Sequence, residues 1–126
     1  MTDISTSWTS GRRVVTWESD GVSSRREFDE PPVAVAVWNE PPSVIVVEPM
    51  HPGGRLDNAI VLDLEGEERI RLQPPRLGGE PHWRLGYYTV YVSQGVLTAV
   101  FQTTVGDFRG VPDLETGELK DVTEWR

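Results

Sequence analysis

Two histidines, His51 and His82, are the side chains of this sequence best suited to general acid–base chemistry near neutral pH. Each lies in a stretch rich in proline and glycine, which predicts a loop. We interpret His51, which precedes Pro52, as an ordinary loop residue. Neither histidine is accompanied by the Gly-x-Ser-x-Gly pattern of a nucleophile elbow. The sequence therefore predicts no catalytic residue, and we favour a non-enzymatic function.

The segment after His82 offers an alternative, because aromatic residues and an arginine follow it and such a mixture can line a small-molecule pocket. The competing interpretation, which we prefer, places the rings in a core with His82 at its rim. If the pocket exists, we expect it to use side chains from several segments: Trp38, His82, Trp83, Arg84, Tyr88 and Phe101. The protein would then be a small β-barrel that binds a small molecule, for example an enzyme of secondary metabolism.

Metal and cofactor sites are weakly indicated. Asp63, Glu65, Glu67 and Glu68 surround Gly66, but their spacing lacks the alternating oxygen ligands of a calcium loop, and we interpret them as a solvated hairpin tip. The chain has no cysteine, which excludes disulfides, thiolate metal sites and cysteine nucleophiles. We expect no metal and no cofactor.

The charge of the chain bears on its partners. Its 126 residues include 20 acidic and 12 basic side chains, a formal net charge of −8. This balance opposes binding to nucleic acid or to anionic membranes and favours encounter with a basic protein. Eleven of the twelve basic residues are arginine, which we take to indicate a GC-rich bacterial genome. The first residues have neither a basic nor an apolar stretch typical of a signal peptide, so we expect a cytoplasmic protein.

Short extended segments separated by turn residues predict the fold. The clearest hairpin joins Tyr87–Val92 to Val96–Phe101 through the three residues Ser93-Gln94-Gly95. The same pattern recurs elsewhere, with expected strands at Val14–Trp17, Val22–Phe28, Val33–Trp38, Val44–Val47, Asn58–Leu62, Arg69–Leu72, Phe108–Val111 and Leu119–Trp125. We therefore predict an all-β, mainly antiparallel sandwich or small barrel of about ten short strands.

Two further expectations concern organisation. Residues 1–11 are polar and lack periodicity, so we expect a flexible tail before a single all-β domain at 12–126. Val33–Trp38 and Val44–Val47 are apolar at successive positions, which predicts central strands covered on both faces. In the Arg69–Leu72 strand, apolar and polar residues alternate, so we expect the arginines to face water.

The closing hairpin carries the residues that we expect to bind a partner. Six carboxylates are concentrated there: Asp107, Asp113, Glu115, Glu118, Asp121 and Glu124. Strict alternation would place Glu118, Lys120, Val122 and Glu124 on one face and Leu119, Asp121, Thr123 and Trp125 on the other. Asp113 is expected to accept hydrogen bonds from amides that follow it, and Gly117 to close the loop in a left-handed conformation.

This ending, from Gly106-Asp107-Phe108-Arg109-Gly110 to Glu124-Trp125-Arg126, resembles the last hairpin of small uncharacterised bacterial all-β proteins, some of which are immunity proteins of toxins. The resemblance implies a cytoplasmic inhibitor that neutralises a toxin through an acidic surface. The function we expect is thus a non-enzymatic, acidic protein-binding module.

Overall fold

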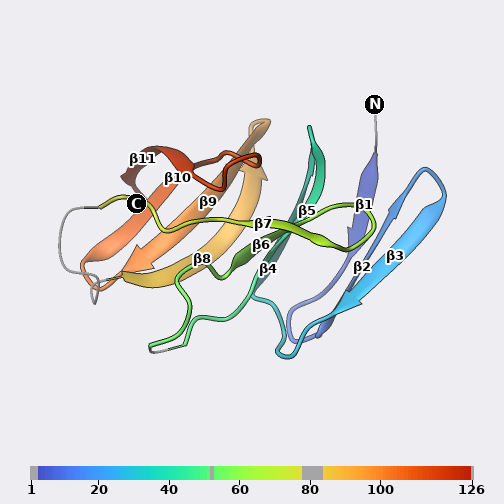
Figure 1. Ribbon diagram of the computed structural model, residues 1–126, viewed down its shortest axis with the longest axis horizontal. Coiled ribbons are helices and arrows are strands. Elements are labelled where there is room, and N and C mark those ends of the chain that lie inside the picture. Colours follow the sequence, from blue (N-terminus) through green and yellow to red (C-terminus); the bar gives the residue numbers. More distant parts are fainter. Residues whose placement is uncertain (1–2, 52, 78–83, 126) are drawn as a thin grey trace.

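The computed structural model describes residues 3–51, 53–77 and 84–125. In these residues the chain forms eleven strands and no helix. The strands form three antiparallel sheets that are stacked as layers (Figure 1). None of the three strand orders closes into a barrel. The prediction of an all-β antiparallel fold is confirmed, in the form of layered open sheets.

The strands follow one another along the chain from sheet to sheet. The first sheet has the order β1-β2-β3 and contains β1 (Ile4–Ser7), β2 (Val14–Ser19) and β3 (Val22–Glu27). The middle sheet has the order β4-β5-β6-β7 and contains β4 (Ala34–Asn39), β5 (Pro42–Val47), β6 (Ala59–Leu62) and β7 (Glu68–Arg71). The last sheet has the order β11-β10-β9-β8 and contains β8 (Arg84–Ser93), β9 (Val96–Thr103), β10 (Gly106–Pro112) and β11 (Leu119–Glu124).

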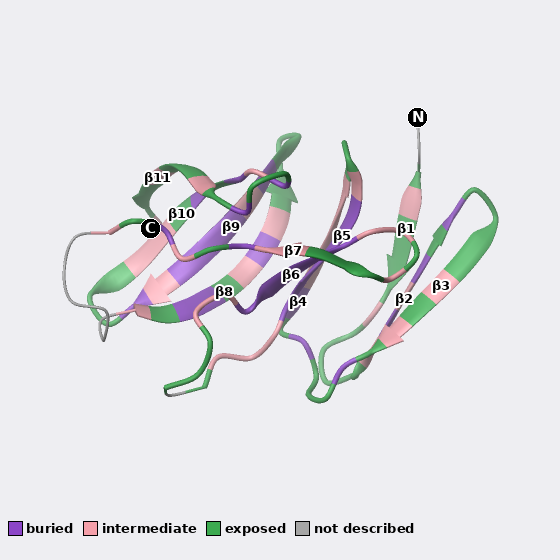
Figure 2. Ribbon diagram, in the orientation of Figure 1, coloured by how far each residue is buried: buried purple, intermediate pink, exposed green. Residues whose placement is uncertain are grey.

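The middle sheet is covered on both faces, and its strands β5 and β6 are almost wholly buried (Figure 2). Alternate side chains of these strands enter two separate cores. The first interlayer core, between the first and middle sheets, contains Val15, Trp17, Phe28, Val44, Val46, Ile60 and Leu62. The second interlayer core, between the middle and last sheets, contains Ala34, Ile45, Val47, Ala59, Val61, Leu72, Tyr87, Val90, Leu97, Ala99, Phe101 and Leu114. This arrangement explains the unbroken apolar runs of β5 and β6, because neither face of these strands meets water.

The position of β4 differs from the prediction. Its side chains contact both cores, with Ala36 and Trp38 on one side and Val35 and Val37 on the other. The strand nevertheless lies at the edge of the middle sheet, and its central residues are only half-buried. An apolar run predicts coverage of both faces, but it does not distinguish an inner strand from an edge strand that neighbouring sheets cover.

Tight turns connect the strands much as the sequence predicts. Asp20 and Gly21 have φ values of 52° and 77°, and Gln94 and Gly95 have values of 51° and 77°. Positive φ at both central residues is typical of the turn that suits the twist of a hairpin. Because Ser93 pairs with Val96, the link between β8 and β9 has two residues and not the three expected.

The start of the chain also differs from the expected loose tail. Ile4–Ser7 forms β1, which pairs with β2 in the register Ile4 with Ser19. Ile4 and Trp8 are half-buried against the first interlayer core, and the Trp8 Nε1 donates a hydrogen bond to the Arg12 carbonyl oxygen over 2.8 Å. The apolar side chains at its two ends therefore hold this polar segment on the body.

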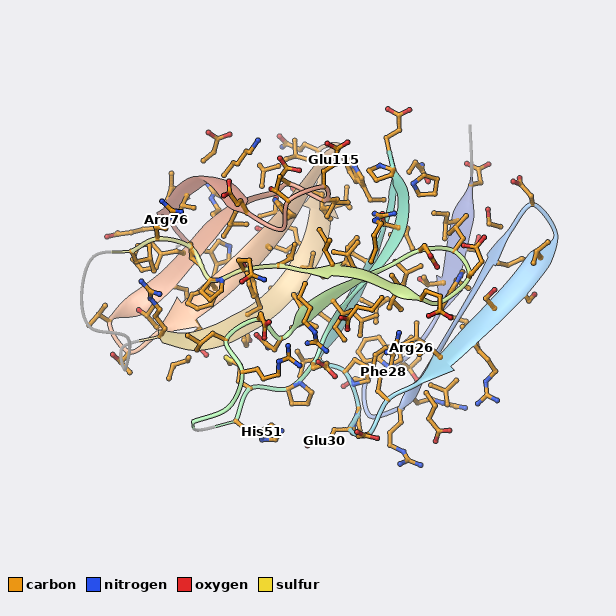
Figure 3. The ribbon with its side chains drawn as sticks, in the orientation of Figure 1. Arg26, Phe28, Glu30, His51, Arg76 and Glu115 are labelled. Carbon is orange, nitrogen blue, oxygen red and sulfur yellow. The ribbon has the colours of Figure 1, made fainter. Side chains whose placement is uncertain are left out.

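The hairpin tip between β6 and β7 is attached to the first sheet. The Trp17 Nε1 donates to the Leu64 carbonyl oxygen over 2.8 Å, and the Arg26 guanidinium donates to the Gly66 carbonyl oxygen over 2.9 Å. Arg26 also lies over the Phe28 ring, 5.5 Å from its centroid (Figure 3). The carboxylates of this tip are exposed or half-buried, as expected, but its backbone is held by two side chains of the first sheet.

Arg71 is the exception to the expected alternation in β7. Its guanidinium is mostly buried and forms ion pairs with Glu48, at 3.2 Å, and with Glu68, at 3.1 Å. It also donates to the Asp57 carbonyl oxygen over 3.1 Å. The sequence pattern placed this arginine in water, whereas it lies among polar partners from three segments.

Candidate functional site

The six carboxylates of the closing hairpin do not form one cluster. Asp113, Glu115 and Glu118 lie in or beside the loop between β10 and β11, whereas Asp107 and Glu124 lie near the other end of these strands. Asp121 lies between the two groups. The predicted binding residues thus occupy three places along one hairpin, and they have to be considered separately.

Asp113 has a structural role in its loop. One carboxylate oxygen accepts hydrogen bonds from the amides of Glu115 and Thr116, over 2.9 and 3.3 Å, and the other lies 2.9 Å from the Lys120 ammonium. The Lys120 contact and these amides lower the pKa of Asp113, and the pKa of Lys120 is raised in turn by Asp113. Gly117 has a φ of 83°, as predicted for the closing position. The Asp113 carboxylate therefore stabilises its own hairpin loop.

A β-bulge at Asp121 overturns the strict alternation expected for this strand. Arg109 pairs with Thr123 and Val111 pairs with Lys120, so two residues of β11 lie opposite Gly110 alone. Asp121 has a φ of 53°, which places it in the left-handed region. A Cβ at Gly110 would lie 2.6 Å from the Lys120 carbonyl oxygen, so the missing side chain permits the close approach.

Asp121 lies at the rim of a hollow on the outer face of the last sheet, the face turned away from the second interlayer core. The hollow has a volume of about 320 Å³. Its wall combines aromatic, aliphatic, hydroxyl and charged groups: Tyr91, Ser93, Gln94, Val96, Thr98, Arg109, Gly110, Val111 and Asp121. Among the residues that the structure describes, neither Arg109 nor Asp121 has an ion pair.

Two aromatic rings meet elsewhere on the last sheet. Tyr88 belongs to β8 and Trp125 follows β11, the two outermost strands of the sheet, and their ring centroids are 6.3 Å apart. β8 is bent in Figure 1, and curvature of a sheet brings side chains of its opposite edges closer together. Val100 is fully buried although its neighbours Ala99 and Phe101 point into the second interlayer core. The outer face therefore has a protected centre.

Exposed apolar residues are concentrated on this sheet. Of the eight large apolar side chains that are exposed in the described part of the chain, six belong to β8–β10 or to their connections: Leu85, Tyr88, Val92, Val96, Val105 and Val111. The outer face of the first sheet differs, since its hollow is lined largely by hydroxyl groups and Glu18. Of the six residues on the last sheet, Val96 and Val111 line the hollow on the outer face and Tyr88 contacts Trp125, whereas Leu85 and Val105 lie at the opposite end of the strands.

The residues of the alternative pocket do not come together. Trp38 and Phe101 lie in or against the second interlayer core, whereas Tyr88 is exposed and contacts Trp125. Arg84 donates to the Leu77 carbonyl oxygen over 3.2 Å. His82 and Trp83 lie outside the described residues. The described members of this set therefore lie in different surroundings, and the pocket stays a prediction.

His51 lies beside an acidic partner, Glu30, from another loop. Its Nε2 is 2.9 Å from a carboxylate oxygen of Glu30, and both side chains are more than half exposed (Figure 3). They line a hollow of about 170 Å³ that includes no serine, threonine or cysteine side chain. Within the described ranges, no group of three histidine, aspartate or glutamate side chains is arranged to hold a metal ion.

The sequence pattern identified Asp121 as a binding residue but not the other residues that line the hollow on the last sheet. Tyr91, Thr98 and Arg109 lie on adjacent strands and share its outer face. The available signal was the alternation of Val90 and Val92 with Thr89, Tyr91 and Ser93, which separates two faces of β8. This alternation does not reveal that Arg109 of β10 lies on the same face, because that conclusion also requires the strand order of the sheet.

Comparison of the chain with protein-family models, with curated proteins and with solved structures found no match in any of the three. The resemblance of the closing hairpin to bacterial immunity proteins thus stays a prediction. Over the described ranges, no helix has the length and apolar character that crossing a bilayer requires.

Proposed function

We propose that this chain is a non-enzymatic binding protein and that the outer face of its last sheet binds a basic protein partner. The observation that carries this proposal is the hollow on this face, which Arg109 and Asp121 border and which Tyr91 and the exposed Val96 and Val111 line in part. Monomeric proteins seldom expose grouped apolar side chains, and such groups mark interaction surfaces. Aromatic residues such as Tyr88 and Tyr91 are typical anchors of protein interfaces.

Charge supports the choice of partner. Residues 84–125 carry six carboxylates and three basic side chains, a formal charge of −3, within a chain of −8. A surface of this sign speeds encounter with a basic protein, and carboxylates at the rim of an apolar patch favour a partner of opposite charge. In its narrower form, which rests on the resemblance of the closing hairpin, the proposal is that the partner is a toxin and this chain its inhibitor.

Capture from the native lysate tests the proposal. The wild-type chain is compared with Val96→Arg and Val111→Arg, which place a cation on the outer face of the last sheet, and with Ser5→Arg on the first sheet. We expect the wild type and Ser5→Arg to recover the same basic protein at low salt. The two variants of the last sheet should lose it, because they add a like charge and fill the hollow.

The recovered protein is then identified by mass spectrometry, and its affinity for each variant is measured by calorimetry at two salt concentrations. A narrower check uses the product of the adjacent gene as the first candidate toxin. The proposal fails if the chain recovers no basic protein, or if Ser5→Arg weakens binding as much as Val96→Arg. Binding of metabolites in place of any protein would support the small-molecule alternative.

A further inference from the structure

The hollow on the last sheet presents two opposite charges beside polar and apolar side chains. Arg109 is exposed in β10, Asp121 is exposed in the neighbouring β11, and both border the same space. Tyr91, Val96 and Val111 supply the apolar part of the wall. A ligand that fills this space thus meets a cation, an anion and an aliphatic surface together.

The two charged residues are neighbours in the sheet, and the charge of Asp121 also contributes to the raised pKa of Lys120. The bulge places Asp121 opposite Gly110, the residue after Arg109, so the two backbones are neighbours in the sheet. Within the described part of the chain, their side chains nevertheless form no ion pair and no hydrogen bond. The left-handed conformation of Asp121 takes its side chain out of the regular alternation of the strand.

We propose that the hollow receives an extended segment of the protein partner that presents one basic and one acidic side chain two residues apart. The basic group would lie beside Asp121 and the acidic group beside Arg109. A Lys or Arg side chain also suits this wall, because its aliphatic stem can pack on Tyr91, Val96 and Val111 while its charged end stays at the rim. This inference rests on the proposed function and specifies the partner's contact segment.

Size supports a segment of this kind. The hollow has a volume of about 320 Å³, and alternate residues of an extended strand, whose side chains share one face, are about 6.8 Å apart. A space of this volume can receive two neighbouring side chains of one face. A purely basic segment would place a second cation beside Arg109, which costs binding energy through like-charge repulsion.

Four end-blocked tripeptides serve as probes: Lys-Ser-Glu, Glu-Ser-Lys, Lys-Ser-Lys and Glu-Ser-Glu. Each is titrated into the full isotope-labelled chain, and amide shifts are followed by NMR. We expect at least one of the mixed-charge peptides to shift the amides of Tyr91, Thr98, Arg109 and Asp121. It should bind about threefold or more tightly than either like-charged peptide, as expected from two partly exposed ion pairs.

A charge reversal sharpens the test. Arg109→Glu gives the hollow two carboxylates, so Lys-Ser-Lys should become the preferred peptide. Arg25→Glu makes the same charge change at an exposed position of the first sheet and should leave the preference unchanged. Asp121→Asn removes the anion, and since asparagine tolerates a positive φ, the bulge should remain while the preference for a basic group is lost.

The outcomes separate this inference from the proposed function. Equal or tighter binding of Lys-Ser-Lys to the wild type, or no reversal in Arg109→Glu, would overturn the mixed-charge segment. Absence of any peptide-induced shift would overturn it too. In each case, loss of the captured partner in Val96→Arg would still support a binding face on the last sheet, whereas unchanged capture would reject that face as well.

Discussion

Asn58 links the middle sheet to the last sheet through a single side chain. It is almost fully buried, and its Nδ2 donates to the carbonyl oxygens of Tyr87 and Glu48, each over 2.8 Å. The Tyr87 amide donates back to its Oδ1 over 2.6 Å. The pairing of β8 with β9 shifts register immediately after Tyr87. The amide of Asn58 thus supplies partners for backbone groups at an irregular point of the strand.

Asn58→Ala is expected to reduce the free energy of unfolding by about 2–4 kcal/mol, because it leaves several buried backbone groups without partners. Asn58→Asp should also destabilise the protein at neutral pH, since a carboxylate cannot donate to the two carbonyl oxygens. Urea unfolding measures the effect, and Ser23→Ala, at an exposed position, serves as the control. A loss below about 0.5 kcal/mol for Asn58→Ala would contradict this role.

Tyr87 gives the stability of the protein a dependence on alkaline pH. Its ring is buried edge-on against Phe101, its hydroxyl donates to the Gln73 carbonyl oxygen over 2.6 Å, and burial raises the pKa of the phenol. The folded chain therefore holds this proton more tightly than the unfolded chain does. The resulting stability is fully present below the unfolded pKa of about 10 and is lost as the pH rises above it.

We expect the free energy of unfolding of the wild type to fall between about pH 10 and pH 12, and Tyr87→Phe to flatten this decline. At neutral pH the same variant should cost about 1–2 kcal/mol, because the Gln73 carbonyl oxygen loses its donor. Denaturant titrations at a series of pH values measure both effects. An equally steep alkaline decline in Tyr87→Phe would assign the pH dependence to other groups.

At the scale of the element, the β10–β11 hairpin depends on two backbone conditions. Gly110 must lack a side chain, because an added Cβ would meet the Lys120 carbonyl oxygen and Leu119, and Asp121 must keep a positive φ. Gly110→Ala is therefore expected to cost about 2 kcal/mol and to displace β11. Asp121→Val should cost about 1 kcal/mol or more, whereas Asp121→Asn should be nearly neutral.

Thermal unfolding and amide spectra of these three variants test the bulge. Gly95 provides a comparison, since an added Cβ there meets no atom within 4 Å and any cost of Gly95→Ala comes from its positive φ alone. Equal destabilisation by Asp121→Asn and Asp121→Val would show that the positive φ is unimportant. It would also remove the geometric basis for placing the Asp121 side chain at the rim of the hollow.

These elements show what a sequence pattern can and cannot predict. The turn within Ser93-Gln94-Gly95 was predictable, apart from its exact length, because a turn is specified by its own residues. The bulge at Asp121 was not, since it depends on Gly110 of another strand. For the same reason, only one of the residues that line the hollow was predicted as a binding residue. Asp121 was identified by its charge, whereas the strand order is needed to see that Tyr91 and Arg109 line the same hollow.

At the scale of the whole molecule, the middle sheet makes the three layers interdependent. Neighbouring residues of β5 point into different cores, with Val46 in the first interlayer core and Val47 in the second. Without the first sheet, the side chains of Val44, Val46, Ile60 and Leu62 would be exposed to water. Burial of such side chains contributes about 1.5–3 kcal/mol each. We therefore expect the chain to unfold as one cooperative unit and not sheet by sheet.

Val46→Ala and Val47→Ala form a matched pair for testing this cooperativity, since each removes the same atoms from a fully buried position, on opposite faces of one strand. Each should cost about 1–3 kcal/mol. Native-state hydrogen exchange at the amides of Trp17 and Phe101 reports on the two cores separately. In a cooperative molecule, both variants lower protection at both amides by the same amount, because these amides exchange only through global unfolding. If Val46→Ala lowered protection at Trp17 alone, the first sheet would open independently, and the binding face on the last sheet would not depend on it.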